Sequence, residues 1–154
     1  KKITAVASGR AEFGPRALGN RSILADPRGD DVKERVNSIK HRESFRPFAP
    51  AILSEHASEY FEGRTGDFMQ YISRCRHADR FPAIVHYDNT SRVQTVPRDS
   101  ESGLRKLLER WYADTGCPMV LHTSLNIKGE PLVNTRPDAQ RWSEKYGVKV
   151  CLPN

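Results

Sequence analysis

The stretch from residue 101 to residue 124 constrains the fold of this chain most strongly. Four apolar residues recur there at the three- and four-residue spacing of one helix face, and Gly116 follows them, as is typical of a helix end. The apolar run that comes next, 118–124, predicts a buried strand. The sequence therefore predicts a helix over 101–114 that leads into a sheet. The apolar helix positions are Leu104, Leu107, Leu108 and Trp111.

Shorter strand-like and helix-like segments mix irregularly along the rest of the chain. They do not follow a strict strand–helix–strand alternation, so we expect an α/β fold with a mixed, twisted sheet flanked by helices. Glycine and proline predict a turn-rich loop over 13–22 and a turn over 128–131. The expected strands are 3–8, 22–26, 48–53, 68–74, 83–87, 93–96, 118–124 and 148–152. The expected helices are 31–40, 55–62, 101–114 and 138–146.

Length and composition limit the class of protein. The 154 residues suit a single domain over 1–154, and 37% hydrophobic with 29% charged residues are typical of a globular protein. No apolar run reaches the length of a membrane span, and the N-terminal segment lacks the apolar core of a signal peptide. The sequence begins and stops in strand-like segments, so we expect a domain cut from a longer chain.

The cysteines indicate the redox environment of the protein, and the net charge indicates what kind of partner it binds. Three cysteines without a CxxC pair argue against a disulfide framework and a structural zinc site, and they favour a reducing, cytoplasmic environment. The net charge of +6 and the pI near 9.4 favour an anionic partner. Nucleotide, phosphate ester and nucleic acid all fit this charge.

The stretch KHRESFRPFAP, residues 40–50, concentrates cations beside two prolines. In extended backbone Lys40 and Arg42 would share a face, and Arg46 would join them if the chain bends before Pro47. Like charges that converge repel one another unless an anion lies between them, and proline lowers the ordering cost of such a site. A solvated basic loop at a helix C-terminus is the alternative, and both interpretations stay open.

The glycine-rich stretch 9–22 is the second candidate for anion binding. Glycine lets backbone N–H groups approach a ligand, and arginine pairs with two oxygens of a phosphate or carboxylate at once. A surface loop whose arginines pair with Glu12 or Asp26 is the alternative. The arginines are Arg10, Arg16 and Arg21.

Two further segments carry polar groups at expected turns or strand ends. Arg92 follows the expected turn at 88–89, where an ordinary hairpin with an exposed arginine is the alternative. The strand over 118–124 ends in hydroxyl and amide side chains, and ligands of open α/β sheets bind at strand ends. Capping of their own backbone by these side chains is the alternative there. They belong to Thr123, Ser124 and Asn126.

Several common motifs are absent. The sequence contains no GxxxxGK[ST] phosphate loop, no GxGxxG and no GxSxG. The five histidines show no HExxH or other metal-ligand spacing, so we expect no metal site built by the protein alone. Glu12, Asp26 and Asp88 are the carboxylates best placed to hold Mg²⁺ together with a nucleotide.

Taken together, four long segments resemble the C-terminal domain of the nodulation-factor and antibiotic (cephamycin, nebramycin) carbamoyltransferases. These segments are GRAEFGPRALGNRSILADPR, VNSIKHRESFRPFAPAIL, DNTSRVQTV and HTSLNIKGEPLV, between about Gly9 and Asp138. The resemblance implies a YrdC-like fold whose KxR and SxN signatures stand here as residues 40–42 and 124–126. Two departures stand out: His122 occupies a position where asparagine is expected, and Leu125 one where an aromatic residue is common.

The resemblance also implies an activity. Domains of this family form carbamoyl-adenylate from ATP and carbamoyl phosphate, and an N-terminal metal-binding domain passes the carbamoyl group to an acceptor hydroxyl or amine. On this basis we expect Lys40, Arg42 and Arg92 at the nucleotide phosphates and the reaction centre. Ser124, Asn126 and neighbouring Thr123 would bind the triphosphate, directly or through Mg²⁺. The residues expected on the carbamoyl phosphate side are Arg16, Arg21 and Arg46.

Two other functions remain as alternatives. A YrdC-like RNA-binding module fits the positive charge, but the arginines lie in glycine- and proline-rich turns and few exposed aromatic residues are expected for base stacking. A synthase of threonylcarbamoyl-adenylate fits the fold, but the FGPRALGNR segment favours the carbamoyltransferases. We therefore expect ATP, carbamoyl phosphate and an N-terminal acceptor domain as partners, without nucleic acid or membrane, and a homodimer stays open.

Overall fold

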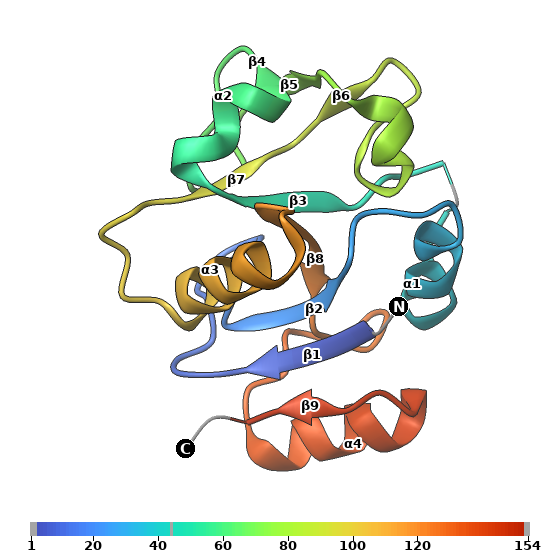
Figure 1. The fold of residues 1–154 in the computed structure, drawn as a ribbon. Coiled ribbons are helices and arrows are strands. Elements are labelled where there is room, and N and C mark those ends of the chain that lie inside the picture. Colours follow the sequence, from blue (N-terminus) through green and yellow to red (C-terminus); the bar gives the residue numbers. More distant parts are fainter. Residues whose placement is uncertain (1–2, 44, 153–154) are drawn as a thin grey trace.

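A mixed six-stranded sheet forms the centre of the computed structural model, which describes residues 3–43 and 45–152 (Figure 1). Its central strands β3, β8, β2 and β1 pair antiparallel, whereas β7 and β9 pair parallel to their neighbours at the two edges. The expected α/β class with a mixed sheet is confirmed. In spatial order the strands are β7 (Gln94–Val96), β3 (Ala49–Leu53), β8 (Met119–Ser124), β2 (Arg21–Ala25), β1 (Ile3–Ala7) and β9 (Val150–Cys151).

Helices cover both faces of this sheet because strand side chains alternate between the faces. Leu24, Ala51 and Val120 point to one face and pack with α3 (Gly103–Thr115). Ile23, Ile52 and Leu121 point to the other face, where α1 (Val32–Lys40) and α4 (Arg136–Tyr146) supply the apolar partners. The central strands β2 and β3 are therefore buried on both sides.

The ends of two helices follow the signals in the sequence. The Ser102 side chain accepts a hydrogen bond from the backbone N–H of Arg105 at the start of α3, and Gly116 ends the helix with φ of 67°. The start of α4 is a capping box between Thr135 and Asp138, with Pro137 in its first turn. The expected helix over 138–146 thus begins two residues earlier.

A small three-stranded sheet lies beyond the β7–β3 edge (Figure 1). It consists of β4 (Phe61–Glu62), β5 (Ser73–Cys75) and β6 (Thr90–Ser91). The expected helix over 55–62 is split into a 3₁₀ turn at Ser54–His56, the short α2 (Ala57–Tyr60) and β4. No helix in the described part of the chain is long and apolar enough to span a membrane.

Two expected strands are wrong. The segment 83–87 contains no strand: Pro82–Ile84 forms a 3₁₀ turn whose buried Ala83 and Ile84 fill the core. Of the segment 68–74, only the end joins β5, because Met69 has a φ of 59° that breaks an extended chain. Ala83 and Ile84 are buried in a turn as they would be in a strand, so apolarity did not distinguish the two structures there.

Candidate functional site

Strand pairing brings the four cation- and hydroxyl-bearing segments to one end of the large sheet. The chain enters β2 from the glycine-rich loop at the end where β8 stops, since Ser22 pairs with Ser124. β3 enters at this same end, because Ala49 pairs with His122, and β7 runs parallel to β3. Loops that precede β2, β3 and β7 therefore converge on the C-terminal end of β8.

A cavity of about 190 Å³ opens where these loops meet, and we call it the arginine cavity. Four guanidinium groups line it, from the loops before β2, β3 and β7, together with hydroxyl groups at the end of β8. Guanidinium groups that surround a polar hollow bind phosphate or carboxylate oxygens. Its charged and hydroxyl-bearing residues are Arg16, Arg42, Arg46, Arg92, Thr123 and Ser124.

A second cavity of about 310 Å³ adjoins the first. The two share Arg42, Arg46 and Arg92, so these three arginines stand between two hollows. Ile72 and His86 complete the second cavity. The arrangement can hold two anions side by side, with the shared cations between them.

The shared arginines repel one another in the absence of an anion. The pKa of Arg42 falls to about 10, first because of burial and then because of the charges of Arg46 and Arg92. Burial also lowers the pKa of Arg92, and the charges of Arg16 and Arg46 add to that shift. No ion pair joins Arg16, Arg42 or Arg92 to a carboxylate in the described ranges 3–43 and 45–152.

Two local contacts hold the Arg42 side chain in place, and its buried Nε–H stays unpaired among the described residues. Its guanidinium carbon lies 4.2 Å from the centre of the Phe48 ring, and one terminal nitrogen donates to the backbone oxygen of Pro47. Its Nε is buried without a partner among the described residues. Arg46 is more loosely held, by an exposed ion pair of 3.5 Å to Glu43.

The Lys40 side chain contacts Ser124 and Asn126 after the end of β8 and does not share an extended face with Arg42. It is the last residue of α1, and His41 after it has a φ of 47°, so the expected extended pairing of Lys40 and Arg42 on one face is wrong. The Lys40 Nζ donates to the Ser124 backbone oxygen at 2.7 Å and to the Asn126 Oδ1 at 2.7 Å. Ser124 Oγ in turn donates to the same Asn126 oxygen at 2.8 Å.

The Lys40–Ser124–Asn126 contact joins both sequence signatures into one unit, with Ser124 facing the arginine cavity. The amide nitrogen of Asn126 donates to the backbone oxygens of Ile127 and Glu130 at 3.0 Å each. Asn126 is therefore fully engaged within the protein and orients Ser124 and Lys40. Neither Lys40 nor Asn126 lines the cavity itself.

Arg21 does not join the other arginines. It is 6% exposed, and its guanidinium donates to five backbone oxygens, including that of Val133 at 2.7 Å and that of Ser8 at 2.8 Å. These contacts tie the glycine-rich loop to the segment before α4. The structure thus gives Arg21 a structural position away from the cavity where the sequence analysis expected it.

The three carboxylates considered for Mg²⁺ are engaged elsewhere. Glu12 Oε1 accepts from the backbone N–H groups of Leu18 and Asn20 at 2.7 Å each and so shapes the loop before β2. Asp26 pairs with Arg28 at 2.8 Å, and Asp88 accepts from Thr90. In the described part of the chain, His, Cys, Asp and Glu form no group of three or more that could hold a metal ion.

Three residues that line the arginine cavity received no role in the sequence analysis. Phe48 and Met69 line the arginine cavity, and the sequence analysis named neither of them as a site residue. His122 was noticed only as a departure from the family pattern, and it lines the cavity from β8. The alternation of β8 was the available signal, since it places His122 and Ser124 on one face.

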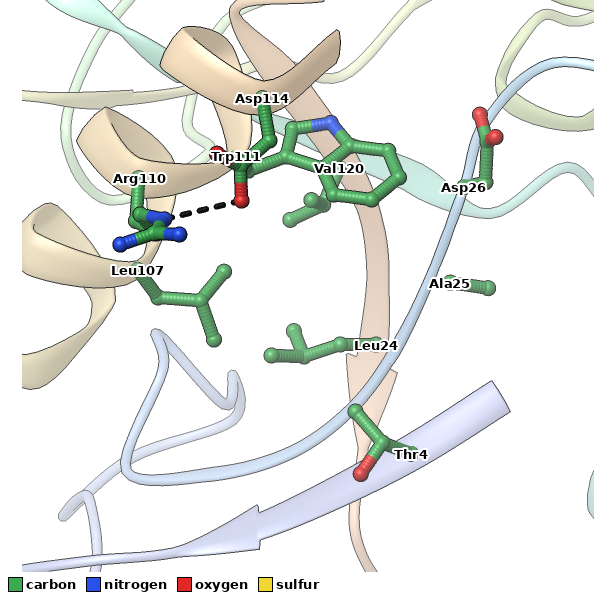
Figure 2. Close-up of a pocket in the computed structure, with 9 residues that line it drawn as sticks. All are labelled: Thr4, Leu24, Ala25, Asp26, Leu107, Arg110, Trp111, Asp114 and Val120. Carbon is green, nitrogen blue, oxygen red and sulfur yellow. Dashed lines mark hydrogen bonds and ion pairs between the residues drawn. The ribbon is translucent and has the colours of Figure 1, made fainter. Parts of the chain in front are cut away.

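A larger apolar groove, of about 530 Å³, lies between α3 and the first strands (Figure 2). Leu24, Leu107, Trp111 and Val120 supply its apolar surface. Its arginine pairs with a carboxylate of the groove itself, at 2.9 Å between Arg110 and Asp114. Because this groove offers an anion no unpaired cation cluster, the arginine cavity is the better candidate site.

The pKa of Lys40 predicts a pH dependence of anion binding. Burial, with a smaller contribution from the charge of Arg42, lowers this pKa from 10.5 to about 8. A bound anion favours charged Lys40, so raising the pH from about 7 to about 9 should weaken anion binding, by up to about tenfold per pH unit above the pKa. Calorimetric titration with sulfate, whose charge is constant in this range, measures the change.

The Lys40→Met variant is the matched control and should show a flatter pH profile. The unliganded protein gives a second readout. Because the folded protein releases the Lys40 proton at lower pH than the unfolded chain does, the free energy of unfolding should rise between pH 8 and 10.5 relative to the variant. Equal pH profiles for both proteins would contradict the role of Lys40.

Comparison with known proteins adds an independent finding. The family model described as "Carbamoyltransferase C-terminus" matches residues 1–152. Nodulation protein NolO of Bradyrhizobium diazoefficiens is 47% identical over 138 residues, which cover 85% of this chain and 25% of the relative. The 3'-hydroxymethylcephem-O-carbamoyltransferase of Amycolatopsis lactamdurans is 37% identical over 148 residues, covering 96% of this chain and 28% of the relative. The chain thus spans about a quarter of the length of these curated relatives.

Proposed function

This chain belongs to the carbamoyltransferase C-terminus family, and from that premise we propose that it forms carbamoyl-adenylate from ATP and carbamoyl phosphate. One observation carries the proposal. Arg42, Arg46 and Arg92 stand between two adjoining cavities, without a carboxylate that neutralises Arg42 or Arg92 in the described residues. Two phosphorylated reactants would supply the missing negative charge.

The proposed reaction balances with one water molecule. Water releases inorganic phosphate from carbamoyl phosphate and leaves carbamate. A carbamate oxygen then attacks the α-phosphorus of ATP, the bond from that phosphorus to the β-phosphate oxygen breaks, and pyrophosphate leaves. The protein's part is to hold two mutually repelling anions in line and to stabilise the charge on the leaving group, which fixed cations do.

The geometry supports a division of roles within the site. Arg42 and Arg92 would contact the reacting phosphate groups from the wall between the two cavities, and Thr123 would donate its hydroxyl group from the end of β8. Ser124, whose hydroxyl proton goes to Asn126, would offer its oxygen to the hydrated Mg²⁺ of the nucleotide. Lys40 would add charge from behind Ser124. Arg16 and Arg46, which are exposed at the mouth, would bind the more peripheral anion.

Mg²⁺ fits this site only as a companion of the nucleotide. Mg²⁺ bound with ATP would neutralise part of the phosphate charge. The described residues form no carboxylate cluster for it, and the Asn126 oxygen is already bonded to Lys40 and Ser124. The protein groups left for a hydrated ion are the hydroxyls of Ser124 and Thr123.

Transfer of the carbamoyl group to an acceptor is proposed to need a further domain. The chain spans only about a quarter of its relatives, one of which is named as an O-carbamoyltransferase of 3'-hydroxymethylcephem. We propose that an N-terminal domain of the complete protein binds the acceptor and receives carbamoyl-adenylate from this site. The acceptor itself is outside this proposal.

Exchange of labelled pyrophosphate into ATP tests the adenylate-forming step. Exchange should require carbamoyl phosphate and Mg²⁺ together, because only the formation of carbamoyl-adenylate is reversed by pyrophosphate. Bicarbonate with threonine in place of carbamoyl phosphate is the control for a threonylcarbamoyl-adenylate synthase. Exchange with that mixture, or no exchange with either, would contradict the proposal.

One observation favours RNA binding as a second candidate function. The expectation of few exposed aromatic residues is wrong: Phe13, Phe45, Phe68 and Tyr87 are all exposed, and they neighbour residues of the two cavities in the sequence. Exposed rings beside cations suit base stacking. Titration with single-stranded RNA at two salt concentrations separates the functions, since a steep salt dependence without any ATP binding would favour RNA.

A further inference from the structure

His122 is a buried polar side chain that the proposed reaction leaves without a task. It is 2% exposed, and neither Nδ1 nor Nε2 has a hydrogen-bond partner among the described residues. A buried polar group without a partner is costly, so native structures keep few of them. Such a group in the wall of a ligand cavity points to a partner that arrives with the ligand.

The strand register places His122 in the wall of the arginine cavity, on the same side as Arg92. His122 of β8 pairs with Ala49 of β3, and both residues line this cavity. Ala51, two residues after Ala49, pairs with Gln94 of β7, so Arg92, two residues before Gln94, extends the same row towards His122. The imidazole and the Arg92 guanidinium therefore belong to one wall of one cavity.

His122 differs chemically from the groups around it. The four arginines of the cavity are hydrogen-bond donors only, so they bind any phosphate or carboxylate oxygen alike. Burial lowers the pKa of His122 to about 4 and keeps its ring neutral, and a neutral imidazole offers one nitrogen as an acceptor. The Ser124 hydroxyl already bonds Lys40 and Asn126. His122 can thus recognise a donor on a ligand.

We propose that His122 accepts a hydrogen bond from the amino group of the carbamoyl moiety and so selects carbamoyl phosphate over acyl phosphates of the same shape. The inference rests on the proposed function, which supplies carbamoyl phosphate as the ligand. Acetyl phosphate is the critical comparison because it replaces this amino group by a methyl group. With that analogue the His122 nitrogen would stay buried and unpaired, which weakens binding.

Calorimetric titration of the protein with carbamoyl phosphate and with acetyl phosphate tests this selection. We expect the unmodified protein to bind carbamoyl phosphate about tenfold more tightly, the effect of one hydrogen bond to a buried group. His122→Leu should bring the two affinities together. His122→Asn, whose amide oxygen is an acceptor, should keep the preference. Inorganic phosphate, which meets only the arginines, should bind all three proteins alike.

Thermal unfolding provides a readout that separates selection from folding. His122→Leu removes two unpaired buried nitrogens, so its Tm should equal or exceed that of the unmodified protein while its selectivity is lost. If this variant does not fold, His122→Met serves in its place, since methionine adapts to irregular space and its sulfur is only a weak acceptor. A lower Tm together with retained selectivity would indicate a merely structural residue.

The outcomes distinguish this inference from the function on which it rests. If the unmodified protein binds neither carbamoyl phosphate nor acetyl phosphate, the proposed function fails and this inference fails with it. If carbamoyl phosphate binds and supports pyrophosphate exchange, but folded His122→Leu still prefers it over acetyl phosphate, only the role of His122 is overturned. Equal binding of the two compounds by the unmodified protein overturns it as well.

Discussion

Arg92→Met should reduce carbamoyl-phosphate-dependent pyrophosphate exchange by at least about 100-fold, the usual loss when one fixed group that stabilises developing charge is removed. Arg92 lines both cavities, and the charges of Arg16 and Arg46 act on it. Methionine keeps most of the side-chain volume but removes the cation between the two anions. Initial exchange rates at saturating ATP and carbamoyl phosphate measure the loss.

The fold of the Arg92→Met variant should persist. Removing one of several mutually repelling cations relieves repulsion in the unliganded protein, so its Tm should stay equal or rise. Arg110→Met is the matched control, because Arg110 pairs with Asp114 in the apolar groove of Figure 2 and should leave the exchange rate unchanged. Full exchange activity in a folded Arg92→Met protein would remove Arg92 from the site.

Arg21→Met should have the opposite effect, a loss of stability of about 1–3 kcal/mol, the usual cost of leaving a buried hydrogen-bond acceptor without its donor. The five backbone oxygens that now accept from the Arg21 guanidinium would lose this donor, and the bond to the Val133 oxygen is fully buried. These oxygens belong to the segments 8–20 and 133–134, so the loop before β2 should detach. Urea unfolding followed by circular dichroism measures the free energy.

Arg10→Met is the control for Arg21→Met, since Arg10 lies on the same loop and is exposed. It should change the free energy of unfolding by less than about 0.5 kcal/mol. A folded Arg21→Met protein of unchanged stability that no longer binds carbamoyl phosphate would restore the ligand role expected from the sequence. Arg92→Met and Arg21→Met together thus separate an arginine of the cavity from an arginine that holds the fold.

Local patterns predicted the large sheet and its long helices well. The helix over 101–114 and the strand over 118–124 were found because a periodic apolar face and a buried run leave little freedom in how they pack. The same reasoning failed at 83–87, where a buried apolar segment is a 3₁₀ turn, and at Met69, whose positive φ has no sequence signal. Both failures lie near the small sheet, where elements are too short for periodicity to decide.

The basic stretch 40–50 shows the same difference within the site, between the kind of residue and the position of its side chain. The stretch 40–50 was expected to gather its cations on one extended face, but α1 continues to Lys40 and turns that side chain towards Asn126. Arg42 and Arg46 nevertheless reach the cavity, since the chain bends after α1 and re-enters the sheet at β3. The kinds of residue were right, and their direction depended on where the helix ended.

The sequence by itself determined which chemistry this chain carries: guanidinium, ammonium and hydroxyl groups in glycine- and proline-rich loops, in motifs long enough to establish the family. Only the tertiary structure decided which of these groups act together. Pairing of β2, β3, β7 and β8 brings four distant loops to one end of the sheet, and the depth of burial separates Arg92 from Arg21. Residue type is local, whereas strand register and burial depend on contacts between residues far apart in the chain.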